Sequence, residues 1–174
     1  MRVSAKADYA ARAAAELSTA TERPIKADRI AQAQDIPAKF LETILLELKH
    51  AGIVRSQRGP DGGYTLARPA EDISVADVIR AVDGPLANVR GDRPENMEYS
   101  GAAESLTDVW IAVRAALREI LETTTLAHLR DHELPSRVAE LADDPEAWIS
   151  LGRIRGAAPT GGRKAQPKAS SARS

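Results

Sequence analysis

A short stretch near the middle of the chain, VRSQRGPDGGYTLAR (54–68), combines three arginines, three glycines and a proline. Arginine pairs well with phosphate groups, and glycine lets a backbone turn sharply or approach a ligand closely. Two chemistries therefore fit: a loop that cradles nucleotide phosphates, or the tip of a β-hairpin that binds nucleic acid. The segment GPDGG is not followed by the Gly-Lys-Ser/Thr of a nucleotide phosphate loop. This comparison favours the hairpin.

Other reactive side chains are sparse. The chain has no cysteine, which excludes disulfides, thiolate catalysis and thiolate metal sites. His128 and His132 are four residues apart and could form half of a zinc or copper site, but no third ligand lies near them in the sequence. The sequence shows no pairing of a nucleophile with a base. We therefore predict no metal, no cofactor and no enzyme activity.

The elements around the arginine-rich stretch suggest how it is positioned. Segment 37–52, PAKFLETILLELKHAG, has Pro37 where a helix should begin and Gly52 where it should end. Its apolar positions form one stripe of a helix, Phe40, Leu41, Ile44, Leu45 and Leu48, with Phe40 expected in the core with one edge exposed. Helices are also predicted at 4–20 and, a short one, at 25–34, and strands at 53–57 and 64–68. This order predicts a mainly α fold with a small β-hairpin, a winged helix-turn-helix.

The second half of the chain predicts an assembly helix. Ser74 and Asp77 form a capping box at the start of a helix over 73–85, and 86–101 is expected to be a loop. A long helix over 103–128 has apolar residues at alternating steps of three and four, as in a helix–helix seam. We expect this helix to form a homodimer through Leu106, Trp110, Val113, Leu117 and Ile120. A short helix is expected within 135–150.

The charges are divided unevenly along the chain. The net charge is +3 over residues 1–70, −10 over 71–150 and +6 over 151–174. We predict a DNA-binding domain over 1–85, a connecting loop over 86–102, dimerisation and C-terminal helices over 103–150, and a disordered basic tail over 151–174. No run of 18 apolar residues occurs, so we expect a cytoplasmic protein without a membrane span.

The stretch PAKFLETILLELKHAGIVRSQRGPDGGYTLAR (37–68) resembles the Rrf2 family of bacterial winged-helix transcription regulators, whose members include IscR, NsrR and CymR. The matching motifs are Phe40-Leu41-Glu42, Ala51-Gly52-Ile53-Val54, Arg58-Gly59 and Gly62-Gly63-Tyr64-Thr65-Leu66. The opening MRVSAKADYAARA and the helix ISVADVIRAVDGP also match in order and spacing. The resemblance covers about residues 1–130.

The resemblance implies a homodimeric repressor or activator that binds a palindromic operator in double-stranded DNA; we expect a repressor. The helix over 37–52 would enter the major groove, and the hairpin tip would enter the minor groove. We predict DNA contacts for Lys39, Phe40, Glu42, Thr43, Arg58 and Gly59. Lys39 suits guanine and Thr43 suits a base edge or thymine methyl, whereas Glu42 either accepts from cytosine or is a solvated charge.

The resemblance also raises the question of a cofactor. Many family members hold an iron–sulfur cluster through three cysteines in the loop before the dimer helix, and the loop of this chain contains none. We therefore expect no cluster, and an effector, if any, that is a small molecule near 86–101 or a partner protein. The alternative function is a protein-interaction module that keeps the winged-helix shape without binding an operator.

Overall fold

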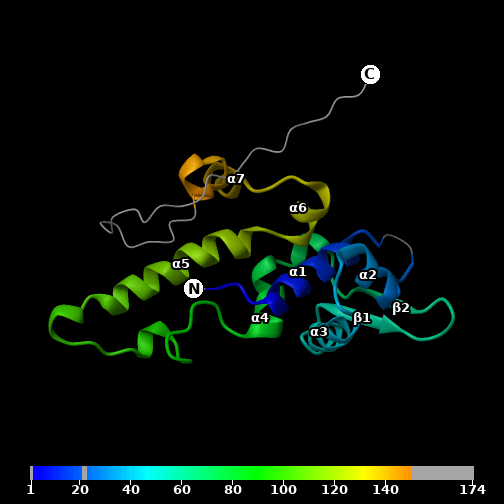
Figure 1. The fold of residues 1–174 in the computed structure, drawn as a ribbon, viewed down its shortest axis with the longest axis horizontal. Helices are drawn as coiled ribbons and strands as arrows, with labels where there is room; N and C mark the ends of the chain where they lie inside the picture. The colour runs from blue at the N-terminus through cyan, green and yellow to red at the C-terminus, as the bar shows by residue number, and fades with distance from the viewer. Residues whose placement is uncertain (1, 21–22, 150–174) are drawn as a thin grey trace, which may run out of the picture.

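The chain folds into helices and one β-hairpin, which lies at one end of the molecule (Figure 1). The structure is a computed structural model, which describes residues 2–20 and 23–149. Within these residues it contains seven α-helices, four short 3₁₀ helices and a two-stranded antiparallel sheet. The mainly α class with a small hairpin is therefore confirmed. The basic tail predicted over 151–174 lies outside the described residues.

Three helices form the first half of the core: α1 (Ala5–Ser18), α2 (Ala27–Gln34) and α3 (Ala38–His50). Ser4 caps α1, since its hydroxyl accepts a hydrogen bond from the Ala7 amide at 2.9 Å. Asp35 adopts a left-handed conformation with φ of 49°, which makes the turn between α2 and α3 tight. The helices bury alanines on α1 against leucine and isoleucine side chains of α2 and α3. Small side chains on α1 let the helices approach closely.

The hairpin is built from β1 (Val54–Gln57) and β2 (Gly63–Leu66), paired from Val54↔Leu66 to Gln57↔Gly63. Its second strand is also tied to the segment before α2. The Ile25 amide donates to the Tyr64 carbonyl at 2.9 Å, and the Tyr64 amide donates to the Ile25 carbonyl at 2.8 Å. These bonds fix β2, one residue pair from the turn, against the segment before α2, while the tip of the hairpin projects from the body (Figure 1).

After the hairpin, the short helix η1 (Ala70–Asp72) leads into α4 (Val75–Asp83). The capping box predicted at the start of α4 is present: the Asp77 amide donates to the Ser74 hydroxyl, and the Ser74 amide donates to the Asp77 carboxylate, both at 3.1 Å. The connection from α4 to the next α-helix contains only η2 (Pro94–Asn96) and η3 (Gly101–Ala103). It is irregular elsewhere, as the sequence predicts for 86–101.

The prediction of a single helix over 103–128 is wrong. The structure has α5 (Leu106–Thr123), a break at Thr124, and then α6 (Leu126–Asp131). At the break the Thr124 carbonyl accepts from the Val75 amide at 2.8 Å, and the Leu126 amide donates to the Ile73 carbonyl at 2.9 Å. These bonds to the start of α4 replace helical ones, and the Thr125 hydroxyl begins a new helix by accepting from the His128 amide.

The chain continues into α7 (Ser136–Asp143) and η4 (Pro145–Trp148), which supply the short helix expected within 135–150. None of the helices over 2–20 and 23–149 is long and apolar enough to cross a membrane. Leu126, from the segment assigned to dimerisation, is fully buried in the same core as α1 and α3. The domain boundaries predicted at residues 85 and 102 stay a prediction, because a residue from beyond residue 102 packs in the core of the first helices.

Candidate nucleic-acid interface

Helix α3 separates its side chains into a buried face and an exposed face. The buried face consists of Leu41, Ile44, Leu45 and Leu48. The predicted DNA-contacting residues lie outside it and are all exposed: Lys39, Phe40, Glu42 and Thr43. Leu46 joins them on the surface, 52% exposed. One turn of α3 therefore presents a cation, an anion, a hydroxyl and an aromatic ring to solvent.

Phe40 does not lie in the core, contrary to the prediction from the apolar stripe. Its side chain is 60% exposed, and its ring meets Tyr9 of α1 edge-on, with centroids 6.3 Å apart and planes at 61°. Leu41, Leu45 and Leu48 already fill the space between α3 and the other helices, so Phe40 lies at the margin of the stripe. Tyr9 is in turn covered by the guanidinium of Arg12, 5.5 Å from the ring centre.

The turn between β1 and β2 is the tip of the wing. It carries the other two residues predicted to contact DNA, Arg58 and Gly59, and both are exposed. Gly59 has a φ of 111°, and its carbonyl accepts from the Gly62 amide at 3.0 Å, which closes the turn. A Cβ at Gly62 would lie 2.4 Å from the Gln57 carbonyl oxygen. The tip therefore requires glycine at 62, because the backbone folds back on itself there.

Helix α5 leaves apolar side chains open to solvent. None of its residues is buried, and the five predicted dimerisation residues are half-buried: Leu106, Trp110, Val113, Leu117 and Ile120. Val109 and Ile111 are 49% and 37% exposed, so they project further from the protomer than the predicted seam does. Their exposure could not be read from the apolar spacing, because the packing of α5 against α4 decides which side of the helix stays open.

Ion pairs fix how α5 lies against the rest of the protomer. The Arg80 guanidinium of α4 donates to the Glu122 carboxylate of α5, and Arg118 Nε donates to the same carboxylate at 2.9 Å. These hydrogen bonds, Arg80 first and then Arg118, lower the pKa of Glu122 below its ordinary value. Arg114 similarly donates to Glu95 of η2. The ionised carboxylates thus connect α5 to α4 and to the preceding loop.

The two histidines considered for a metal half-site have separate roles. His128 Nδ1 accepts from the Thr125 amide at 3.0 Å, within the cap of α6. His132 follows α6 in a left-handed conformation with φ of 58°. They are therefore not paired on one helical face. No group of three or more His, Cys, Asp or Glu residues suited to a metal occurs in the described part of the chain.

Comparison with known proteins agrees with this geometry. Residues 3–132 match the model of the Rrf2 family, described as "Iron-dependent Transcriptional regulator". The chain is 52% identical over 151 residues to "Putative HTH-type transcriptional regulator Rv1287" of Mycobacterium tuberculosis, covering 86% of this chain and 94% of that protein. It is 33% identical over 133 residues to the HTH-type transcriptional regulator CymR of Bacillus subtilis, covering 76% and 91%.

Solved structures show the same likeness. The structure of CymR, described as the global cysteine regulator of B. subtilis, superposes with a TM-score of 0.65 at 32% identity, over 76% of this chain and 98% of CymR. The structure of T. potens IscR gives a TM-score of 0.60 at 30% identity, over 87% and 94%. These structures share the fold of this chain, and the relatives named above are HTH-type transcriptional regulators. The chain belongs to the Rrf2 family of DNA-binding transcription regulators, and it is not an enzyme.

Proposed function

We propose that the protein is a homodimeric, sequence-specific regulator, acting in the cytoplasm as a repressor at a palindromic operator. The observation that carries the proposal is the shared exposure of Lys39, Glu42 and Thr43 on α3 together with Arg58 at the wing tip. A helix with polar side chains on its outer face fits the major groove, and an arginine at a narrow tip suits the minor groove. Repression requires only that the bound dimer occupies the promoter.

Each residue has a chemical reason for its assigned role. Lys39 is at the start of α3, where the side chain can donate to guanine O6 and N7. Thr43 can offer its methyl group or hydroxyl to a base, although its hydroxyl also lies 3.3 Å from the Lys39 carbonyl. Glu42 selects for cytosine by accepting from its amino group. Phe40, held against Tyr9, offers an apolar edge to thymine methyl groups or sugars.

Dimerisation would cover the apolar side of α5. Two grooves run beside this helix: one of about 380 Å³ that includes Leu117 and Leu121, and one of about 300 Å³ that includes Trp110 and Val113. The Trp110 indole nitrogen is buried without a hydrogen-bond partner in the described residues. A second copy of α5 would fill these grooves, since Ala112, Ala115 and Ala116 are small and exposed enough for helices to approach closely.

The description of the family as iron-dependent requires a test of the donor atoms. The chain contains no cysteine, and soft sulfur ligands are what iron–sulfur clusters require. In the loop, the Asp92 carboxylate accepts from the Arg93 amide and the Asn96 side chain, and Glu95 is paired with Arg114. These residues do not fit a cluster. We therefore propose that this member regulates without one.

The operator can be found with the purified full-length protein. Fragments of the source genome recovered by the wild type should share a palindrome whose half-sites lie about one helical turn, ~10 base pairs, or a multiple apart. The variant Lys39→Ala/Arg58→Ala should recover no such motif, and Arg137→Ala, on the exposed surface of α7, should recover the same motif as the wild type. Recovery of unrelated fragments by all three proteins would favour a protein-interaction module instead.

A further inference from the structure

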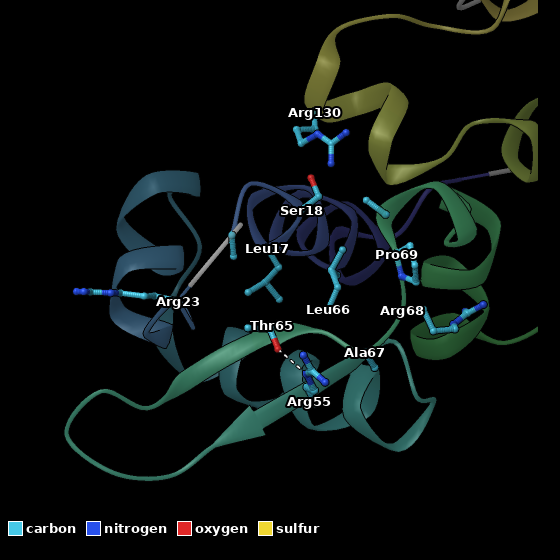
Figure 2. Close-up of a pocket in the computed structure, with 12 residues that line it drawn as sticks. Leu17, Ser18, Arg23, Arg55, Thr65, Leu66, Ala67, Arg68, Pro69 and Arg130 are labelled. Atoms are coloured by element: carbon cyan, nitrogen blue, oxygen red, sulfur yellow. Dashed lines mark hydrogen bonds between the residues drawn. The ribbon is translucent and has the colours of Figure 1, made fainter.

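A pocket of about 530 Å³ opens between the C-terminal end of α1, the hairpin and α6 (Figure 2). Four arginines line it from separate parts of the chain: Arg23 before α2, Arg55 on β1, Arg68 after β2 and Arg130 on α6. The described residues that line it include no aspartate or glutamate. Ligand pockets for small molecules have volumes of this order, roughly 300–1,000 Å³. The lining therefore favours an anion of the size of a metabolite.

The arginines are held in place but keep donors for a ligand. Arg55 Nε donates to the Thr65 hydroxyl at 3.0 Å, and the Thr65 hydroxyl keeps its own hydrogen for another acceptor. One nitrogen of Arg68 donates to the Asp72 carbonyl at 3.0 Å. Arg130 donates twice to Asp131, at 2.7 Å each, outside the lining. Each guanidinium has five N–H groups, so donors are left over on all three.

The pocket also has an apolar wall. Ala67 and Pro69, both exposed, contribute carbon surface beside the arginines, whereas Leu17 in the lining is only 1% exposed. Figure 2 shows Arg55 and Thr65 on the hairpin and Arg130 on α6, with Leu17 and Leu66 between them, while the Arg23 and Arg68 side chains point outward to opposite sides. A simple inorganic ion would leave this wall without a partner. A phosphate-bearing organic molecule matches both the cations and the apolar wall.

The pocket lies on the hairpin face that is turned away from α3, the helix proposed to enter the major groove. Lys49 Nζ of α3 donates to the Ser56 hydroxyl at 2.9 Å, so the Ser56 side chain is on the face toward α3. Neighbouring residues of a strand point to opposite faces, so Arg55 points away from α3, and its cross-strand partner Thr65 lies on the same side. A molecule in the pocket would therefore not occupy the DNA-contacting face of α3.

We propose that this pocket binds a free, phosphate-bearing small molecule, and that binding changes the affinity for DNA. The ligand would connect the hairpin through Arg55 and Thr65 to α6 through Arg130, and α6 follows the helix assigned to dimerisation. It would thereby restrain the wing relative to the dimer. Such a ligand regulates only if the DNA-competent and incompetent conformations bind it with different affinities. The regulatory part rests on the proposed function, whereas the binding site does not.

Binding is tested without DNA, by calorimetry of the full-length protein with pyrophosphate as the probe. The wild type and the surface control Arg137→Gln should bind pyrophosphate saturably in the millimolar range or better. Arg55→Gln and Arg130→Gln should bind about tenfold more weakly, the scale of losing a charge-assisted hydrogen bond. Unchanged thermal unfolding of the variants in the absence of ligand would show that they fold. No saturable binding by the wild type, or equal binding by all four proteins, would overturn the site.

Regulation is tested by fluorescence anisotropy on operator DNA with and without pyrophosphate. The apparent Kd of the wild type should shift severalfold, while that of Arg130→Gln should not. An unchanged Kd would overturn the regulatory role. If Arg55→Gln and Arg130→Gln weaken DNA binding without pyrophosphate, and operator DNA displaces pyrophosphate, the arginines contact the DNA backbone and the free-ligand proposal is wrong. Failure to find an operator would leave the calorimetric result intact, so the two proposals fail separately.

Discussion

Lys49 Nζ in the last turn of α3 donates a hydrogen bond to Ser56 Oγ in β1, at 2.9 Å. This bond joins α3, the helix proposed to enter the major groove, directly to β1 of the hairpin, two residues before Arg58. The Ile53 amide, which donates to the Leu48 carbonyl at 2.9 Å, reinforces the same connection through the backbone. The position of the wing tip is therefore set by α3, so α3 and Arg58 would approach DNA as one unit.

Arg58→Ala should weaken specific operator binding by about 1–3 kcal/mol, the scale of a good base or groove contact. The expected cause is the loss of a cation from the tip, because Arg58 is exposed there and belongs to no part of the core. Fluorescence anisotropy at fixed salt concentration measures the change. Arg137→Ala removes an exposed arginine from α7 and should leave the operator affinity as it is. Equal affinities for wild type and Arg58→Ala would remove this residue from the interface.

Gly62→Ala should damage the wing without unfolding the helices. The added Cβ would lie 2.4 Å from the Gln57 carbonyl oxygen and 2.8 Å from that of Gly59, so the backbone of the tip must move. We expect operator affinity to fall as far as in Arg58→Ala, with helical circular dichroism unchanged. Pro60→Ala is a matched control at the tip, since it makes a side chain smaller. Wild-type affinity in Gly62→Ala would show that tip geometry is unimportant.

Val113→Glu should convert dimers to monomers. Val113 is half-buried beside α5's 300 Å³ groove, and a carboxylate there would be left without a partner when a second copy covers it. Light scattering at micromolar concentration should give the mass of one chain, and operator affinity should fall. Leu141→Glu places the same charge on α7 and should stay dimeric. A wild type that is already monomeric under these conditions would contradict the proposed dimer.

The order of elements could be predicted because each has local signals: the stripe of α3, the Ser74–Asp77 cap and the glycines between the strands. The exposure of Phe40 and the helix break at Thr124 could not be predicted, because both depend on residues distant in the sequence. Phe40 packs against Tyr9, and the break is bonded to Ile73 and Val75. The exposed face of α3 followed from helical spacing. The arginine pocket could not be predicted, because its four arginines are spread from residue 23 to residue 130 and meet only in the folded chain.

Glu122→Gln should lower the melting temperature at neutral pH, because Glu122 accepts from Arg80 of α4 and Arg118 of α5. These bonds lower the pKa of the Glu122 carboxyl in the folded state. The stabilisation is therefore present above the unfolded-state pKa and is lost as the pH falls through the lower folded-state pKa. The difference in melting temperature between wild type and variant should shrink as the pH is lowered through the acidic range. Glu104→Gln, which is exposed on the loop before α5, is the control. A difference that grows toward acidic pH would contradict the assignment.

Reconstitution with iron and sulfide under anaerobic conditions should leave the protein colourless and its operator affinity unchanged. Clusters in proteins are held mainly by cysteine thiolates, and this chain has none; its only sulfur atoms are the thioethers of Met1 and Met97. Met97 lies in the loop, where its sulfur is 3.5 Å from an Arg90 nitrogen, and that cation disfavours a metal ion beside it. An apo-ferredoxin treated in parallel should turn brown, which checks the procedure. A visible chromophore bound in stoichiometric amount, or DNA affinity that follows the iron content, would show that this protein senses iron through ligands other than cysteine.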